Sequence, residues 1–173
     1  IISIIFLITL VYSIDKTGTS AAKFLSINAG SRAVGMGGAF TAIATDGSAM
    51  VWNPAGIARL DGNTYYAEHS SWLVDIYHSY LGFTVKNGTH SSWGMNYVAL
   101  GMPDMKVTRY GEEDTGETFR AGSWALGLTW AINLTNRFSI GFNGKYIRES
   151  ISRSVASGAA LDVGTLFNTI YGP

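Results

Sequence analysis

The sequence contains no cysteine in its 173 residues. This absence excludes disulfide frameworks, thiolate nucleophiles and cysteine-ligated zinc or iron–sulfur sites. Charge is also scarce, because only 14% of the residues are charged against about 25% in soluble domains, and this deficit points toward lipid. Lys+Arg and Asp+Glu number 12 each, so there is no basic excess to attract nucleic acid. A nucleic-acid partner is therefore not predicted.

Apolar runs long enough to cross a bilayer are missing as well. The run at 1–12 (IISIIFLITLVY) falls short of the roughly 20 residues that a spanning helix needs. It is followed by the small residue Ser13 and the polar Asp15 and Lys16, as in a secretory signal peptide. We therefore predict that 1–13 is the C-terminal part of a signal peptide, with a buried N-terminal strand as the alternative. Any membrane integration would then use strands.

The next stretch, 14–62, is rich in Gly, Ala and Ser and shows neither helical nor strand periodicity. Asp46-Gly47 is a turn signal. Asn53-Pro54 is typical of a helix start, because Asn caps well and Pro suits the first helical position. The sequence thus predicts a compact segment with one short helix from Pro54, ended by Asp61-Gly62.

From residue 63 the pattern changes to alternation with a period of two, which predicts strands over 77–85, 92–99, 121–132 and 137–146. Large apolar residues fall on one face and small or polar residues on the other. In 137–146 the apolar face carries Phe138, Ile140, Phe142 and Tyr146, and the other face carries Arg137, Ser139, Asn143 and Lys145. Strands of about ten residues match tilted membrane strands better than the shorter strands of soluble sheets.

The connections favour a meander. Compact turn sequences occupy 86–89 and 133–136, whereas longer polar stretches at 101–118 and 149–157 are expected to be loops at the opposite end. Aromatic residues near the strand ends suit interfacial girdles, and they are Tyr65, Tyr66, Trp72, Tyr77, Trp93, Trp130 and Tyr146. We therefore predict an all-β fold, an antiparallel up-and-down transmembrane β-barrel over 63–173, in preference to a soluble β-sandwich.

The barrel is predicted to be incomplete. Residues 63–173 suffice for about six strands, and a closed single-chain barrel needs at least 8, so we expect an N-terminal fragment. Polar residues on the small face are candidates to face the lumen, either bonding the glycine-rich segment or lining a solute path, with plain polar filling as the default. They are Asn96, Ser123, Asn143, Lys145 and Asp162.

No catalytic, metal or cofactor site is predicted. The three histidines lack metal-ligand spacing, and no serine stands in a nucleophile context. Gly35-Met36-Gly37 resembles the start of the Gly-x-Gly-x-x-Gly motif that binds dinucleotides. However, Phe40 stands at the sixth position of that motif, and Ile57 stands where an acidic residue is required to bind the ribose. We therefore expect a protein that is not an enzyme.

Two elements of the glycine-rich stretch carry a resemblance. The first runs from Gly30 to Ala42 with Gly30, Arg32, Gly35, Gly37 and Gly38, and the second is Asn53-Pro54-Ala55-Gly56. Together they resemble the PorV/PorQ family of outer-membrane proteins, in the wider group that includes FadL-type long-chain fatty-acid transporters. The similarity extends through 69–82 and 161–164.

The resemblance implies a bacterial outer-membrane barrel of about fourteen strands, reached after signal-peptide cleavage, with 14–62 folded into its lumen as a plug or hatch. It also implies a role as a component or partner of type IX protein secretion at the cell surface, meeting cargo through extracellular loops. The alternative is a FadL-type transporter of long-chain fatty acids or other hydrophobic compounds, whose ligand would be a hydrophobic small molecule. The expected surroundings are outer-membrane lipid.

Overall fold

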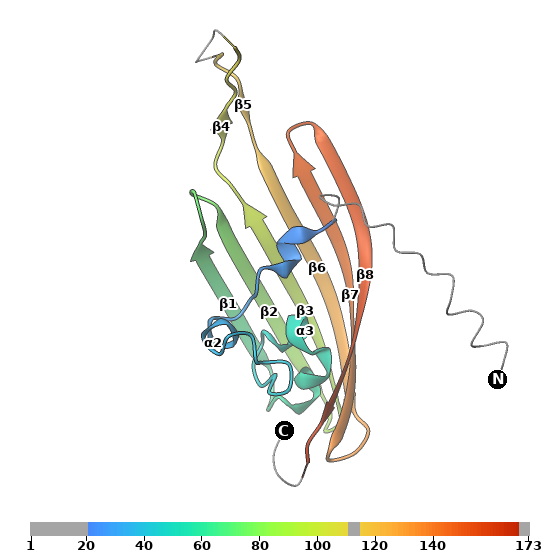
Figure 1. Cartoon of the computed structure of the whole chain (residues 1–173). Coiled ribbons are helices and arrows are strands. Elements are labelled where there is room, and N and C mark those ends of the chain that lie inside the picture. The colour runs from blue at the N-terminus through green and yellow to red at the C-terminus, as the bar shows by residue number, and fades with distance from the viewer. Residues whose placement is uncertain (1–20, 111–114, 170–173) are drawn as a thin grey trace, which may run out of the picture.

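The computed structural model describes residues 21–110 and 115–169, and its main feature is a curved, six-stranded antiparallel sheet (Figure 1). The strand order is β1-β2-β3-β6-β7-β8, and each strand pairs with its neighbour in this order. The strands are β1 (Thr64–Ser71), β2 (Tyr77–Asn87), β3 (Ser91–Gly101), β6 (Ala121–Asn133), β7 (Phe138–Ile151) and β8 (Ser154–Phe167). We call this sheet the wall.

The wall is open, because β1 and β8 lie at its two edges and do not pair with each other. This confirms the predicted up-and-down topology and the predicted incomplete barrel of about six strands. The predicted signal segment 1–13 lies outside the described residues. Within the described parts of the chain, no helix is long and apolar enough to cross a bilayer.

The two faces of the wall differ as the alternation predicts. The concave face is buried and carries small or polar side chains, among them Thr84, Ser92, Asn96, Thr129 and Asn143. The outward face exposes large apolar side chains, among them Leu81, Trp93, Met95, Leu128 and Val163. The prediction that Tyr66 belongs to an interfacial girdle is wrong. Its ring packs against buried Tyr80 on the concave face, at 5.8 Å between centroids.

The prediction of a long loop at 149–157 is wrong. Strands β7 and β8 continue through 149–157 and leave only Ser152 and Arg153 between them. Ser152 adopts φ 54°, the left-handed conformation that two-residue hairpins require. This turn could not be predicted from the sequence, because β8 begins with small and polar residues that show no contrast between its two faces.

The other predicted loop, 101–118, contains a short ladder. Met105–Lys106 (β4) pairs with Thr118–Phe119 (β5), and this hairpin projects beyond the wall (Figure 1). Val107 N–H also donates to the Glu117 carbonyl at 2.9 Å. The structure therefore has one long connection, at the end opposite the β2–β3 and β6–β7 turns.

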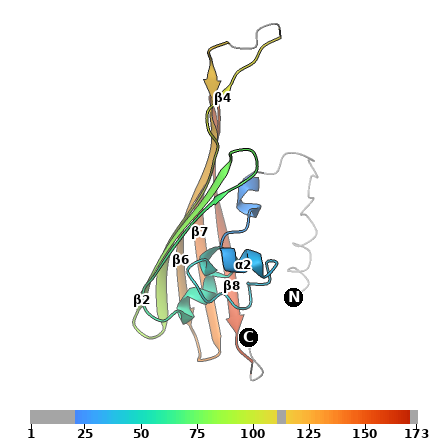
Figure 2. The same cartoon turned by 90° about the vertical axis from the view of Figure 1, so that its left-hand side faces the viewer.

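Residues 21–62, which we call the N-terminal segment, lie against the concave face of the wall (Figure 2). The predicted short helix is confirmed as η3 (Pro54–Arg59), a 3-10 helix in which the Asn53 side chain accepts from Ala55 N–H at 3.2 Å. Three further short helices were not predicted, because four or five residues are too few for a periodic pattern. They are η2 (Lys23–Ser26), α2 (Ser31–Gly35) and α3 (Ala49–Trp52).

The apolar core forms between the N-terminal segment and the wall. Phe40, Met50 and Ile57 are fully buried in one cluster, and Phe24 packs with Tyr80 and Val98 of the wall in a second. Since burial of a large apolar side chain contributes about 1.5–3 kcal/mol, this core holds the segment on the concave face.

Candidate functional site

The N-terminal segment touches the wall most closely at inward-facing glycines. A Cβ atom at Gly94 would lie 2.5 Å from Met50 Sδ, and one at Gly82 would lie 2.9 Å from the Gly47 carbonyl oxygen. Cβ atoms at Gly141 and Gly164 would overlap Pro54, with Ala55 and Asn53 also in the way. These glycines therefore let the backbone of the segment approach the sheet closely.

Asn53 is the main polar link between the segment and β8. Its buried amide nitrogen donates to the Thr41 carbonyl at 2.9 Å and to the Thr165 carbonyl at 2.9 Å. Its oxygen caps η3 through Ala55 N–H. One side chain thus satisfies the start of a helix, a loop of the segment and a strand of the wall, and a buried amide requires such partners.

Further contacts hold the end of η3, and the sequence did not reveal them. Arg59 Nε donates to Ser139 Oγ at 2.7 Å, while Lys86 Nζ and Asn133 Nδ2 both donate to the Ala58 carbonyl, at 2.6 and 2.9 Å. Burial lowers the pKa of Arg59, but an arginine remains charged at neutral pH. These donors satisfy carbonyl and side-chain oxygens that would otherwise be stranded between segment and wall.

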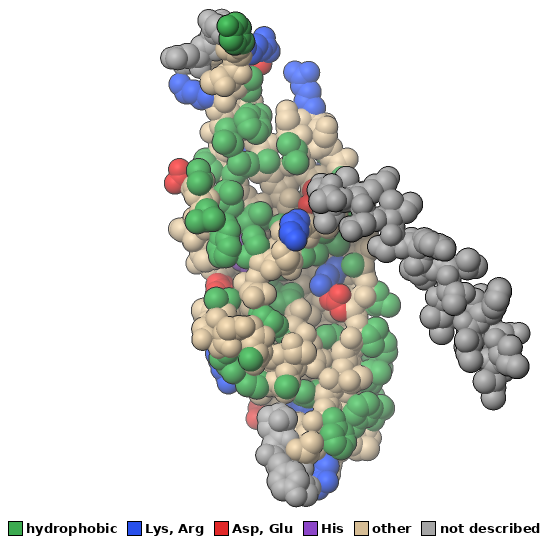
Figure 3. Space-filling model, in the orientation of Figure 1, with side chains coloured by type: hydrophobic (Ala, Val, Ile, Leu, Met, Phe, Trp, Pro, Cys, Tyr) green, Lys and Arg blue, Asp and Glu red, His purple; other side chains and the backbone are tan. Residues whose placement is uncertain are grey.

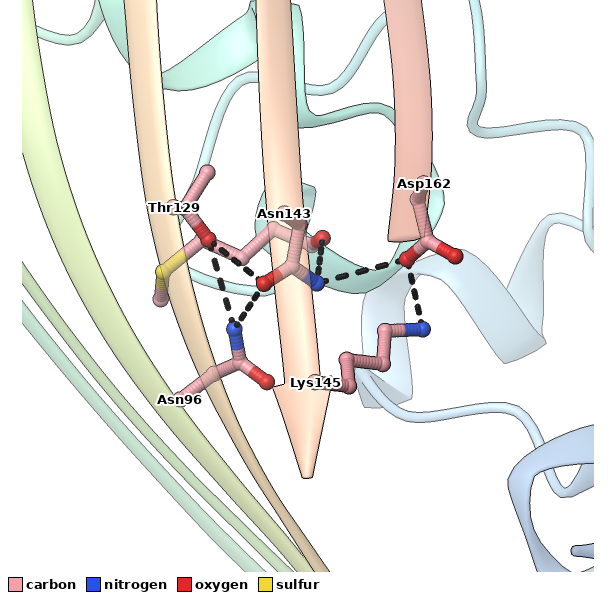
Figure 4. A network of polar contacts seen from close by, with 6 residues as sticks. Asn96, Thr129, Asn143, Lys145 and Asp162 are labelled. Atoms are coloured by element: carbon pink, nitrogen blue, oxygen red, sulfur yellow. Dashed lines mark hydrogen bonds and ion pairs between the residues drawn. The ribbon is translucent and has the colours of Figure 1, made fainter. Parts of the chain in front are cut away.

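Polar side chains from four wall strands converge beneath α3 (Figure 4). Asn143 Nδ2 on β7 donates to the Met50 carbonyl at 3.2 Å and to Asp162 Oδ2 at 3.3 Å. Its Oδ1 accepts from Asn96 Nδ2 at 3.3 Å and from Thr129 Oγ1 at 3.1 Å. Because Asn143 uses both ends of its amide, it connects β3, β6, β7 and β8 to the N-terminal segment.

Lys145 completes this network by pairing with Asp162, at 2.6 Å between Nζ and Oδ2. Four of the five candidate lumen-facing residues therefore come together on the concave face. Ser123 does not join them, because it lies near the other end of β6, beside the connection to the β4–β5 hairpin. The participation of Thr129 and of the Met50 carbonyl could not be predicted from the sequence.

The first glycine element mostly shapes the segment itself. Gly30 adopts φ 95° beside Ser48, and its N–H donates to Glu68 on β1 at 2.6 Å. Arg32 is exposed, bonds Thr45 at 2.9 Å and lies 5.6 Å from the centre of the Phe40 ring. Gly38 at φ 82° packs beside Trp52. Of these contacts, the Gly30–Glu68 hydrogen bond reaches the wall.

Gly35 and Gly37 are exposed and meet nothing near their Cβ positions. In the second element, Pro54, Ala55 and Gly56 are buried, and a Cβ at Gly56 would overlap the Ala44 backbone. The Asn53–Gly56 element therefore packs directly against the wall, through the Asn53 bond to Thr165 and the close contact of Pro54 and Ala55 with Gly141.

Comparison with known families identifies this architecture. The family described as "Type IX secretion system protein PorV" matches residues 13–172. The chain belongs to the PorV family. No curated protein in the comparison matches it. Membership makes this chain a type IX secretion system protein, and the interface described above belongs to a PorV-family protein.

The histidines of this PorV-family chain form no recognisable catalytic arrangement. His69 Nδ1 lies 2.9 Å from Ser79 Oγ on the outward face, but within the described residues no carboxylate bonds this histidine as a triad requires. His78 is buried, and its Nε2 has no hydrogen-bond partner among the described residues. The same part of the chain contains no group of three or more His, Asp or Glu side chains that could hold a metal.

Replacing Lys145 with methionine tests the network without removing its centre. We expect the free energy of unfolding to fall by about 1–2 kcal/mol, because Asp162 loses its closest cation while keeping Asn143. Urea unfolding of the refolded protein in detergent micelles measures the change. Lys23→Met is the matched control, since Lys23 is exposed on η2, and an equal loss in both variants would contradict a role for the ion pair.

Proposed function

We propose that the chain forms part of an outer-membrane β-barrel that acts without catalysis in type IX secretion, as a partner of secreted cargo at the cell surface. The family match over residues 13–172 carries this proposal. In it, residues 63–173 supply the first strands of the barrel and 14–62 form the plug. Residues 1–13 are the end of a cleaved signal peptide.

The outward face supports membrane insertion. Two rows of aromatic rings cross the wall, one through Trp93, Trp130 and Phe142 at 6.3 and 6.1 Å between centroids, and one through Tyr97, Trp124 and Tyr146 at 6.2 and 5.8 Å. Exposed Met95, Leu126 and Leu128 lie between the rows. Aromatic girdles that enclose an apolar band are the pattern of outer-membrane barrels.

The contacts of the N-terminal segment support a plug that stays seated. Besides Asn53, the Tyr80 hydroxyl donates to the Gly47 carbonyl at 2.8 Å, and Ala22 N–H donates to Glu149 at 3.1 Å. These bonds reach the segment from both halves of the wall. A seated plug blocks solute flow, which suits a cargo-binding protein better than an open pore.

The projecting β4–β5 hairpin is the proposed cargo contact. It belongs to the long connection of the wall, and outer-membrane barrels place their long loops outside the cell. Tyr110 near its tip is fully exposed, while the ion pairs Arg109–Glu117 at 2.9 Å and Arg120–Asp104 at 2.8 Å brace its two arms. An exposed aromatic on a braced hairpin is suited to bind a protein surface.

Transport of a hydrophobic compound is the second candidate, favoured by a cavity between segment and wall. It measures about 230 Å3 and is lined by Leu25, Ile27, Val51, Trp52, Val98 and Lys145, among others. This volume lies below the 300–1,000 Å3 of typical ligand sites. Cargo binding therefore remains the preferred function.

Replacing residues 105–119 with a short Gly-Ser turn separates these two functions. We expect the shortened full-length protein to insert and fold, because the hairpin projects beyond the wall, but to capture at least tenfold less secreted cargo. Affinity capture of the full-length protein from the outer membrane, with mass spectrometry of bound proteins, measures the loss.

The matched control keeps residues 105–119 and carries the substitution Leu134→Ser, in the exposed β6–β7 turn at the opposite end of the wall. Undiminished cargo capture by the shortened protein would contradict the hairpin assignment. Fatty-acid binding that is lost on Asn53→Ala, with no cargo recovered from the parent protein, would overturn the secretion role.

A further inference from the structure

The outward face has a groove at the end that carries the β4–β5 hairpin. The groove measures about 720 Å3, and the large rings of Tyr77, Tyr97 and Trp124 stand around it. Small residues lie between these rings, since Tyr77 pairs across the strands with Gly101 and then Gly122, and Ser79 pairs with Ala99. A depression therefore forms where the small outward residues Ala99, Gly101 and Gly122 lie beside the rings of Tyr77 and Trp124.

Cationic side chains border this groove on the side away from the apolar band. Arg120 and Arg153 line it, and Arg148 on β7 is exposed directly opposite Trp124. Seen from the concave side, Lys and Arg side chains also lie at the tips of the β4–β5 hairpin and of the β7–β8 turn (Figure 3). This end of the outward face thus combines aromatic walls with a basic rim.

The positive charge of this rim is mostly uncompensated. Arg120 pairs with Asp104 at 2.8 Å, whereas Arg148 and Arg153 form no side-chain ion pair or hydrogen bond with the rest of the described chain. The nearby Glu149 belongs to the concave face, where it accepts from Ala22 N–H. Two free guanidinium groups remain to bind an anion, and planar guanidinium groups bind phosphate in bidentate geometry.

An apolar depression continues from the groove into the band between the aromatic rows. It measures about 320 Å3, is lined mainly by Tyr65, Ala67, Leu81, Phe83 and Met95, and shares Tyr97 with the groove. A ligand that fits both parts needs a hydrocarbon chain for the depression and an anionic group for the rim. Both parts open on the face that carries the exposed apolar side chains.

We propose that this groove binds a phosphorylated lipid of the outer leaflet, with an acyl chain along Tyr97 and a phosphate between Arg148 and Arg153. The inference rests on the proposed membrane location, which puts the apolar band in lipid and the basic rim at headgroup level. Charge complementarity selects the occupant, because a neutral lipid would leave the arginines unpaired and a soluble anion would leave the apolar depression empty.

The test uses the full-length protein in phosphatidylcholine nanodiscs that contain either lipid A with its two phosphates or the dephosphorylated form. Native mass spectrometry counts the lipid A that stays bound to the ejected protein. We expect Arg148→Gln/Arg153→Gln to weaken retention of the phosphorylated form about tenfold or more, since each lost cation removes attraction to an anionic lipid headgroup. Retention of the dephosphorylated form is expected to stay low and unchanged.

Two further variants complete the experiment. Arg137→Gln makes the same change of charge in the exposed β6–β7 turn and should leave retention unchanged. Gly122→Leu should also abolish retention by filling the groove, because a Cβ at Gly122 meets only the Leu100 carbonyl at 3.7 Å.

Equal retention by the double arginine variant and the parent would overturn the lipid site and leave the membrane location standing. A parent protein that does not enter nanodiscs at all would instead overturn the proposed location, and the lipid site with it.

Discussion

Replacing Asn53 with alanine is expected to lower the free energy of unfolding by about 3 kcal/mol and to release the N-terminal segment from the wall. The change removes the donor from the part-buried Thr41 and Thr165 carbonyls and the acceptor from the buried Ala55 N–H, and a group left unsatisfied in a buried site costs about 1–3 kcal/mol. Loss of the helix cap adds to the same effect. Urea unfolding of the refolded protein measures the change in stability.

Release of the segment has its own measurement, because residues 21–62 should become sensitive to protease before the strands of the wall do. Asn136→Ala is the matched control, since Asn136 is exposed in the β6–β7 turn and should change stability by less than about 0.5 kcal/mol. An Asn53→Ala protein as stable and as protease-resistant as the control would show that Asn53 does not hold the segment.

Replacing Gly141 with leucine is expected to cost about 3 kcal/mol or more, because the added side chain must occupy the space of the Pro54 and Ala55 backbone. A side chain that is crowded by a substitution can move aside. The backbone of Pro54 and Ala55 has little room to do so, because it is packed between the wall and the rest of the segment. We expect the variant either to fold with the segment displaced or to fail to reach a heat-modifiable, folded form. Gel mobility with and without heating measures the outcome.

Gly144 provides a control on the same strand. It lies on the outward face of β7, and a Cβ there meets nothing within 4 Å. Gly144→Leu should therefore fold normally and leave the segment in place. Equal folding of both leucine variants would contradict the close contact between η3 and the wall.

The wall was predictable because its signal is local. Residues such as Phe142 and Asn143 are neighbours in sequence but face different surroundings, so a period of two is imprinted along each strand. The same contrast predicted which face of β6 and β7 is polar. Where β8 begins, at Ser154, small and exposed residues erase the contrast, and the two-residue turn before it was missed.

The helix at Pro54 was predictable from its cap, which needs only Asn53 and Pro54 in succession. The contacts of Arg59 with Ser139 and of Lys86 with Ala58 were not, because they join residues far apart in the chain. Their partners follow from strand register and from the seating of the segment, which no local pattern encodes. The separation of Ser123 from the other inward polar residues likewise follows from its place along β6, which the alternation alone does not show.

The contact of Gly30 with the wall could not be predicted from the sequence either. The resemblance marked it as part of a motif, but the partner of its N–H is Glu68, on the first strand of the wall. The structure gives a physical reason for Gly30, Gly38 and Asn53 of the motif, whereas Gly35 and Gly37 are exposed and meet nothing near their Cβ positions.

Oxygen accessibility of spin labels tests most directly whether the outward face of the wall lies in lipid. Because the sequence contains no cysteine, single cysteines can be introduced at outward Leu126, Leu128 and Val163, and at Leu134 in the β6–β7 turn as the aqueous control. In outer-membrane vesicles the first three labels should be accessible to oxygen and shielded from a water-soluble nickel chelate, with the reverse at Leu134. Equal chelate accessibility at all four positions would contradict a membrane-spanning wall.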